Sequence, residues 1–322
     1  MTLGTTFWDL GDSKKAVEQE ERARAIYTEH LGPDHQQTLS SMHNLAVSYA
    51  AMGRHGDALK LREDSLAIRK RVLPPDHPDI LSSMNNLANN YAALGRYVDA
   101  LKLREETLAA RKRVLTPDHP DTLRSMNNLA LSFRDLDRTI EALKLNEETL
   151  AARRRVLPPD HPDTLQSMGN LALSYWDVGR HADALKMLED VLTIRKRVLP
   201  PDHPDTLKCQ RNLASIYSEL GRHAEALRLQ EETLDSQKRV LPPSHPDRIA
   251  GMSNLAGSYE ALGRHEDAFK LREETLAAFK RALPPNHPDT LSAMNNLANS
   301  YYALGRHPDA LRLYEETLAA RL

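Results

Sequence analysis

One asparagine recurs along this chain at a constant spacing of 42 residues. A carboxamide carries both a hydrogen-bond donor and an acceptor, so a row of them suits bonding to the main chain of an extended polypeptide. Asparagine is a mediocre helix former, so helix stability does not explain its retention. The alternative is that each asparagine bonds to the neighbouring copy and fixes how the copies stack. The row comprises Asn44, Asn86, Asn128, Asn170, Asn212, Asn254 and Asn296.

Neighbouring positions on the same helix face vary between copies, and the middle copies concentrate basic and aromatic residues there. Arginine and aromatic side chains on a concave surface are typical of binding hot spots. Acidic residues such as Asp177 lie in the adjoining column and neutralise part of the charge, so an acidic ligand is not required. The alternative is that these residues vary without functional consequence because they lie on a helix face exposed to solvent. The candidate contacts added to the row are Asn85, Asn127, Arg124, Arg134, Trp176, Lys208 and Arg211.

The residues needed for catalysis or metal binding are present but are not gathered in one place. Ser, His and Asp recur in every copy, whereas an active site normally occurs once. The sequence contains none of the phosphate-binding, zinc-protease or serine-hydrolase motifs. Rows of histidines would lie roughly 10 Å apart on stacked helices, whereas zinc ligands lie about 2 Å from the metal. We therefore predict a protein without catalytic residues, metal or cofactor.

The composition restricts the partners and the compartment. The 43 Lys and Arg residues nearly balance the 45 Asp and Glu residues, which argues against nucleic acid as a partner. No apolar stretch reaches the roughly 18 residues that a membrane span needs. Residues 1–15 lack a basic start and an apolar segment, and Cys209 is the single cysteine. We therefore predict a cytoplasmic protein that binds neither nucleic acid nor membrane.

The spacing of apolar residues predicts two helices in each 42-residue copy. Leu81, Met84, Leu87 and Tyr91 follow one another at intervals of three and four, which places them on one stripe of a helix. Gly95 then suits the left-handed residue that ends a helix. The second helix closes on a basic triplet such as residues 69–71, where positive charge complements the helix dipole. Such triplets alternatively form a basic ridge for an acidic partner.

A fixed period of this length is typical of a solenoid, in which each unit packs only on its neighbours. We predict one array over residues 1–322, starting with a partial helix at 1–10 and a second helix at about 13–30. Seven helix pairs then start near residues 36, 78, 120, 162, 204, 246 and 288, the last being truncated at 322. Neither end has an obvious polar cap, so we expect a fragment of a longer array or ends that stack on other copies.

The recurring pattern Leu87-Ala88-x-x-Tyr91, Gly95-Arg96 and Ala100 resembles the tetratricopeptide repeat, whose usual period is 34 residues. The Asn-Asn-Leu-Ala run and the Asp-His-Pro-Asp connection look like the 42-residue repeats of kinesin light chains and of arrays attached to NTPase sensor proteins. This resemblance implies an all-α, right-handed superhelical solenoid of antiparallel helix pairs. It also implies that the asparagine face lines a concave groove in which extended peptides bind.

We predict a non-catalytic protein-interaction scaffold whose partner is a protein or peptide. Two alternatives remain open. One is a structural solenoid that self-associates end to end, and the other is the sensor or ligand-binding arm of a larger STAND-type NTPase. The heptad segment by which kinesin light chains join their motor chain is absent, which argues against a transport role.

Overall fold

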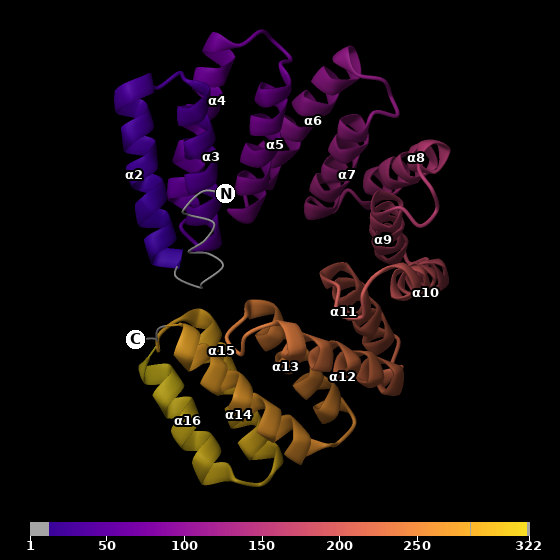
Figure 1. Cartoon of the computed structure of the whole chain (residues 1–322). Helices are drawn as coiled ribbons and strands as arrows, with labels where there is room; N and C mark the ends of the chain where they lie inside the picture. Colours follow the sequence, from indigo (N-terminus) through magenta and orange to yellow (C-terminus); the bar gives the residue numbers. More distant parts are fainter. Residues whose placement is uncertain (1–12, 284, 321–322) are drawn as a thin grey trace. The chain divides into compact units, whose positions relative to one another are not determined.

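The computed structural model describes residues 13–283 and 285–320, which form α-helices joined by short turns, without a strand among them (Figure 1). The chain divides into two compact units, residues 1–180 and 181–322. Unit 1 contains α2 (Ser13–Leu31), α3 (Gln36–Ala51), α4 (His55–Val72), α5 (Pro78–Ala93), α6 (Tyr97–Val114), α7 (Pro120–Asp135), α8 (Thr139–Val156) and α9 (Pro162–Asp177). Unit 2 contains α10 (His181–Val198), α11 (Pro204–Glu219), α12 (His223–Val240), α13 (Pro246–Ala261), α14 (His265–Ala282), α15 (Pro288–Ala303) and α16 (His307–Ala319).

These helices form the all-α repeat solenoid that the sequence predicts. The odd-numbered helices α3 to α15 open the pairs, and the even-numbered helices α4 to α16 close them. The expected partial helix at residues 1–10 and the last two residues lie outside the described part of the chain. The arrangement of all copies as a single array stays a prediction.

A histidine caps each opening helix. In α5 the His77 Nδ1 accepts a hydrogen bond from the Asp79 main-chain N–H at 3.1 Å, and Pro78 occupies the first turn. A capping acceptor satisfies one of the N–H groups that a helix start leaves without a partner. The same cap occurs at His35, His119, His161, His203, His245 and His287. The regular histidine row is therefore explained by helix capping.

Each opening helix ends on a residue in the left-handed conformation. Gly95 has a φ of 72°, and Asp137, which replaces the glycine in one copy, has a φ of 57°. The next residue, Arg96, lies over the Tyr91 ring at 4.4 Å and pairs with Asp99 at 2.7 Å. The Tyr91 hydroxyl donates to Glu63 of the preceding helix. This cluster fixes the turn within each pair and joins it to the previous pair.

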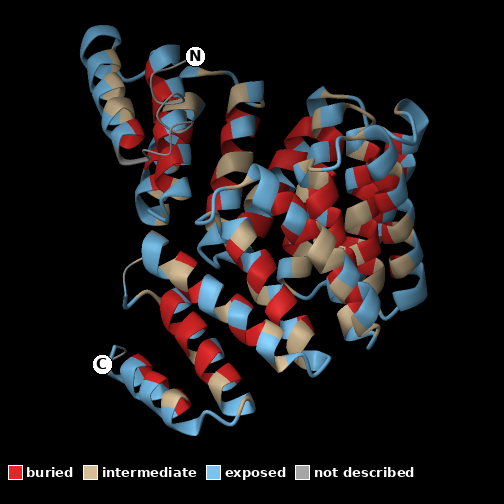
Figure 2. Ribbon diagram, turned by 60° about the horizontal axis from the view of Figure 1, so that its bottom comes forward, coloured by how far each residue is buried: buried red, intermediate tan, exposed pale blue. Residues whose placement is uncertain are grey.

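The core lies between consecutive helices. Leu87 and Ala88 of α5 are buried with Leu81 and Met84, as the apolar stripe predicts. Figure 2 shows buried residues as bands along the helices, with exposed residues on the opposite faces. The alanine of the Leu-Ala pair is 0 or 1% exposed in every opening helix. Its small side chain allows neighbouring helices to approach closely and leaves the asparagine beside it on the outer side.

Candidate functional site

The asparagine row lies opposite the buried stripe of the opening helices. In unit 1, Asn44 is exposed and the next three members are half-buried. In unit 2, Asn212 is half-buried and the last two members are exposed. The full row is Asn44, Asn86, Asn128, Asn170, Asn212, Asn254 and Asn296. None of these side chains is fully buried, so a ligand can reach the row in both units.

The hydrogen bonds of the row distinguish its two interpretations. Asn128 Nδ2 donates to Asn85 Oδ1 of the preceding copy at 2.6 Å, which is the contact expected of a stacking residue. Within residues 13–283 and 285–320, no other member of the row makes a side-chain hydrogen bond to the protein. Six of the seven carboxamides therefore keep their donors and acceptors for water or a ligand.

Other polar side chains join the copies beneath this surface. Arg104 of α6 is 5% exposed, and its guanidinium donates to the Asn128 carbonyl oxygen at 2.9 Å and to the Ser132 hydroxyl at 2.7 Å. Corresponding pairs are Arg62 with Asn90, Asn146 with Ser174 and Arg272 with Ser300. Stacking of the copies is thus held by buried side chains of the closing helices.

The first arginine of each basic triplet belongs to this interior network. Arg111 is 3% exposed and donates to the Asp121 carbonyl oxygen at 2.8 Å and to Ser125 at 2.7 Å. The third arginine, Arg113, pairs with Asp76 of the preceding connection at 2.7 Å. The same two contacts recur at Arg153 and Arg155. The interpretation of the triplets as a basic ridge is therefore wrong for the first arginine. The third arginine is paired with a carboxylate at Arg71, Arg113 and Arg155.

Two of the predicted contact residues are occupied by this network. Asn127 is 4% exposed, and its carboxamide oxygen, oriented to match its neighbours, accepts from Arg153 at 3.1 Å. Asn85 accepts the bond from Asn128. We leave both out of the proposed ligand contacts, because engaging them would break bonds between copies.

The basic residues of the middle copies are largely paired with carboxylates. In unit 1, Arg134 pairs with Asp177 at 2.5 Å, and Arg124 pairs with Asp121. The Trp176 side chain, which precedes Asp177 in the sequence, is half-buried. In unit 2, Arg211 pairs with Asp247 at 2.6 Å, and Lys208 is exposed. The expected neutralisation by Asp177 is thus confirmed. A single cluster formed by all five candidates stays a prediction, because they belong to two separate units.

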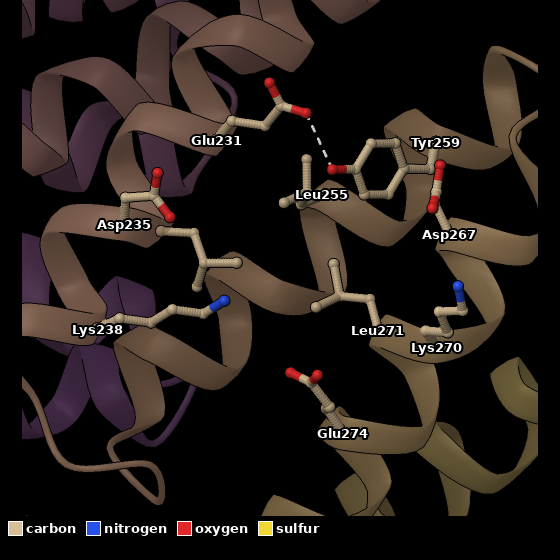
Figure 3. Close-up of a pocket in the computed structure, with 10 residues that line it drawn as sticks. Glu231, Asp235, Lys238, Leu255, Tyr259, Asp267, Lys270, Leu271 and Glu274 are labelled. Atoms are coloured by element: carbon tan, nitrogen blue, oxygen red, sulfur yellow. Dashed lines mark hydrogen bonds between the residues drawn. The ribbon is translucent and has the colours of Figure 1, made fainter.

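Two cavities flank α12 in unit 2. One, of about 360 Å³, lies between α12 and α14 and has Leu255 and Leu271 at its floor (Figure 3). Glu231 accepts from the Tyr259 hydroxyl at its edge, at 2.9 Å. Burial and the Glu231 charge raise the pKa of Tyr259 to about 12, so this hydroxyl stays a donor. The other cavity, of about 420 Å³, is lined by Lys196, Pro201, Gln210, Glu232, Asp235, Ser236 and Arg239.

Sequence reasoning missed three residues of the larger cavity. Gln210 stands where the other six complete copies have methionine, and it is 4% exposed. Asp235 and Ser236 occupy positions that are alanine, isoleucine or threonine elsewhere. A comparison of the repeat columns outside the asparagine face reveals them, since three polar replacements meet at one cavity.

The repeat model of the tetratricopeptide family matches residues 1–71, 44–103, 79–155, 127–197, 163–239 and 247–322. The chain belongs to the tetratricopeptide repeat family. Its members are generally non-catalytic interaction scaffolds, so this family places the chain among proteins that bind protein or peptide partners.

Solved structures give the same fold. A P. anserina putative kinesin light chain with nearly identical repeats is 33% identical, with a TM-score of 0.59, over 63% of this tetratricopeptide repeat chain and 96% of that chain. The apo form of the quorum sensor NprR from B. thuringiensis is 17% identical, with a TM-score of 0.55, over 98% and 100% of the two chains. A Rap protein complexed with Competence and Sporulation Factor is 12% identical, with a TM-score of 0.62, over 96% and 79%.

No curated protein matches the chain. Among the described residues, no helix has the length and apolar character needed to cross a membrane.

Proposed function

We propose that this tetratricopeptide repeat protein is a scaffold that binds an extended segment of a partner protein along its asparagine face. The observation that carries the proposal is the contrast between two sets of polar residues. Buried arginines and serines join the copies, while six asparagines of the row have no side-chain hydrogen bond within the described chain. A residue retained in every copy without an internal role is expected to have an external one.

Within each unit, the spacing of the row suits an extended ligand. Packed helices lie roughly 10 Å apart, and an extended chain advances about 3.3 Å per residue. One asparagine would therefore meet about every third residue of the ligand. Its amide would donate to a carbonyl oxygen and its oxygen would accept from an N–H of the ligand main chain, so that binding tolerates different side chains.

Residues beside the row would give the binding its selectivity. In unit 1 the half-buried Trp176 offers an aromatic surface, and Arg134 is already paired with Asp177. Because this arginine is neutralised, we propose a ligand that packs an apolar or aromatic side chain on Trp176. The chain shares its fold with a Rap protein that is complexed with Competence and Sporulation Factor, so this fold is compatible with ligand binding.

Replacing Asn86, Asn170 and Asn212 by alanine tests the proposal. These three side chains have no internal partner among the described residues, so helicity should be unchanged. Peptides enriched from a display library on the unaltered protein should bind the triple variant at least tenfold more weakly, measured by fluorescence anisotropy. A matched control replaces Lys102, Lys144 and Lys186, which lie exposed on closing helices, and should retain affinity.

A second variant tests selectivity, since Arg134→Ala with Trp176→Ala should change which peptides are enriched. Undiminished binding by the asparagine variant would refute the proposal. A library that yields no enriched peptide would also count against it and would favour end-to-end assembly of copies.

A further inference from the structure

A small cavity in unit 1 is lined by cations and hydrogen-bond donors and has no carboxylate in its wall. It lies among α3, α4 and α5 and has a volume of about 10 Å³. Its polar lining comprises His43, Arg62, Ser65, Arg69, Ser83 and Asn86. A space of this size holds one water-sized particle. Two arginines facing one cavity without an acid are unusual, because buried charges in proteins are normally paired.

The two guanidinium groups have only neutral hydrogen-bond partners. Arg62 donates to the Asn86 carbonyl oxygen at 3.2 Å and to Asn90 Oδ1 at 2.8 Å. Arg69 donates to the Asp79 carbonyl oxygen at 3.2 Å and to the Ser83 hydroxyl at 2.6 Å. The Nε–H group of each arginine is buried and has no acceptor. Each buried donor without a partner costs about 1–3 kcal/mol, and more where the group is charged.

The charges of the two arginines affect the pKa of a neighbouring histidine. His43 lines the same cavity, and its pKa is lowered by burial and by the charges of Arg62 and Arg69. Burial lowers the pKa of both arginines as well, although the charge of Asp79 acts in the opposite direction on Arg69. The wall therefore has an excess of positive charge and of unused N–H donors, which is the environment that favours an anion.

The next copy has the same pair of arginines in a different setting. Arg104 and Arg111 occupy the positions of Arg62 and Arg69, but Asn85 replaces His43 and bonds to Asn128 across the stack at 2.6 Å. Thr107 replaces Ser65 and adds a methyl group. Arg104 also gains a third acceptor, Asn89 Oδ1, at 2.9 Å. The Arg104 Nε–H is also buried without an acceptor, so the next copy differs from this cavity in the residues that line it and in the additional acceptor of Arg104, not in that donor.

We propose that the cavity between Arg62 and Arg69 binds a single-atom monovalent anion of the size of chloride. The anion would accept from the two buried Nε–H groups and from the Ser65 hydroxyl, and it would fasten α4 to α5. A single-atom anion is proposed because it needs the least room of the common anions and the cavity measures only about 10 Å³. No peptide takes part in this inference, although Asn86 belongs both to the lining of the cavity and to the asparagine row.

The test follows the His43 ring by NMR while sodium chloride replaces sodium gluconate at constant ionic strength. The ring signals should change and saturate, and the pKa of His43 should rise, because an anion favours the protonated imidazole. Histidines remote from the cavity, such as His223, should not respond. Crystals soaked in sodium bromide should show an anomalous peak within hydrogen-bond distance of Arg62 and Arg69.

Variants that introduce the residue found at the equivalent position of another copy distinguish a bound anion from an ordinary buried water. Ser65→Thr, which reproduces Thr107, should weaken chloride binding at least tenfold without loss of fold. Arg62→Asn, which reproduces Asn146, should abolish the response, whereas Arg104→Asn should leave it unchanged. A His43 signal that does not saturate, no bromide peak, or an unaltered response in the Arg62→Asn variant would each overturn the proposal.

Discussion

Cys209 departs from the repeat pattern at a single residue, and its surroundings determine how readily its thiol loses a proton. The four preceding copies have serine at this position. The Cys209 thiol is 2% exposed and donates to the Leu188 carbonyl oxygen at 3.7 Å. Burial raises its pKa to about 11, although the positive charge of Arg195 acts in the opposite direction. The neighbouring Leu188 and Ile216 are apolar where most copies have a polar pair, so the thiol lies in an unusually apolar part of unit 2.

The raised pKa predicts a pH-dependent stability. An unfolded thiol loses its proton near its ordinary pKa of 9.0, and the folded thiol loses it only near 11. Between these values the folded state binds more protons than the unfolded state, so the free energy of unfolding falls as pH rises. The decrease should be about 2 kcal/mol in urea titrations. Cys209→Ser, which restores the residue of the other copies, should flatten this part of the profile. An identical profile in the variant would contradict the assignment.

At the scale of the helix, the capping histidine allows a prediction about the free energy of unfolding. His119 Nδ1 accepts from the Asp121 N–H at 3.1 Å at the start of α7. His119→Ala removes this acceptor and should lower the free energy of unfolding by about 1 kcal/mol. His119→Asn supplies another acceptor and should restore most of the loss. Guanidinium titrations of the three proteins measure the difference, and equal stability of the alanine variant would show that the cap contributes nothing.

The helices and their ends were predictable from the sequence because each depends on local signals. The apolar stripe through Leu87, the proline at the first turn and the glycine at the end all act within a few residues. Asp76 and His77 both precede α5 and both residue types offer a capping acceptor, and the structure shows that His77 is the cap. Repetition strengthened every signal, since each copy is an independent instance of the same pattern.

Burial of polar side chains was not predictable in the same way. Arg111 is one of three consecutive basic residues at a helix end, and nothing in α6 alone distinguishes it from Arg113. It is buried because Ser125, on the next helix pair, accepts its hydrogen bond. The same limit applied to Asn127, which the face pattern assigned to a ligand and which Arg153 engages. Contacts between copies require the angle at which one pair packs on the next, and a single-helix pattern does not contain it.

At the scale of the whole molecule, packing between sequence neighbours predicts that disturbances stay local. Within each unit, the described helices pack mainly on the helices that precede and follow them in the chain. The stability of such a chain is approximately a sum of unit and interface terms. Ser125→Ala removes the acceptor of Arg111 and should cost about 1–3 kcal/mol at the interface of α6 with α7. Hydrogen exchange measured by mass spectrometry should become about tenfold faster or more in α6, α7 and α8.

A comparable change in unit 2 is Ser300→Ala, which removes the hydroxyl that accepts from Arg272 at 2.6 Å and leaves the pair of Arg272 with Glu260 in place. It should accelerate exchange in α14, α15 and α16 and leave α6 to α8 unchanged, while Ser125→Ala should leave α13 to α16 unchanged. These reciprocal patterns would show that each polar pair stabilises the interface between its own two copies independently of the other pair. A uniform acceleration over both units in either variant would instead mean that the chain opens as one cooperative body. In that case the buried arginines would stabilise the molecule collectively, and a ligand on one asparagine would influence the entire row.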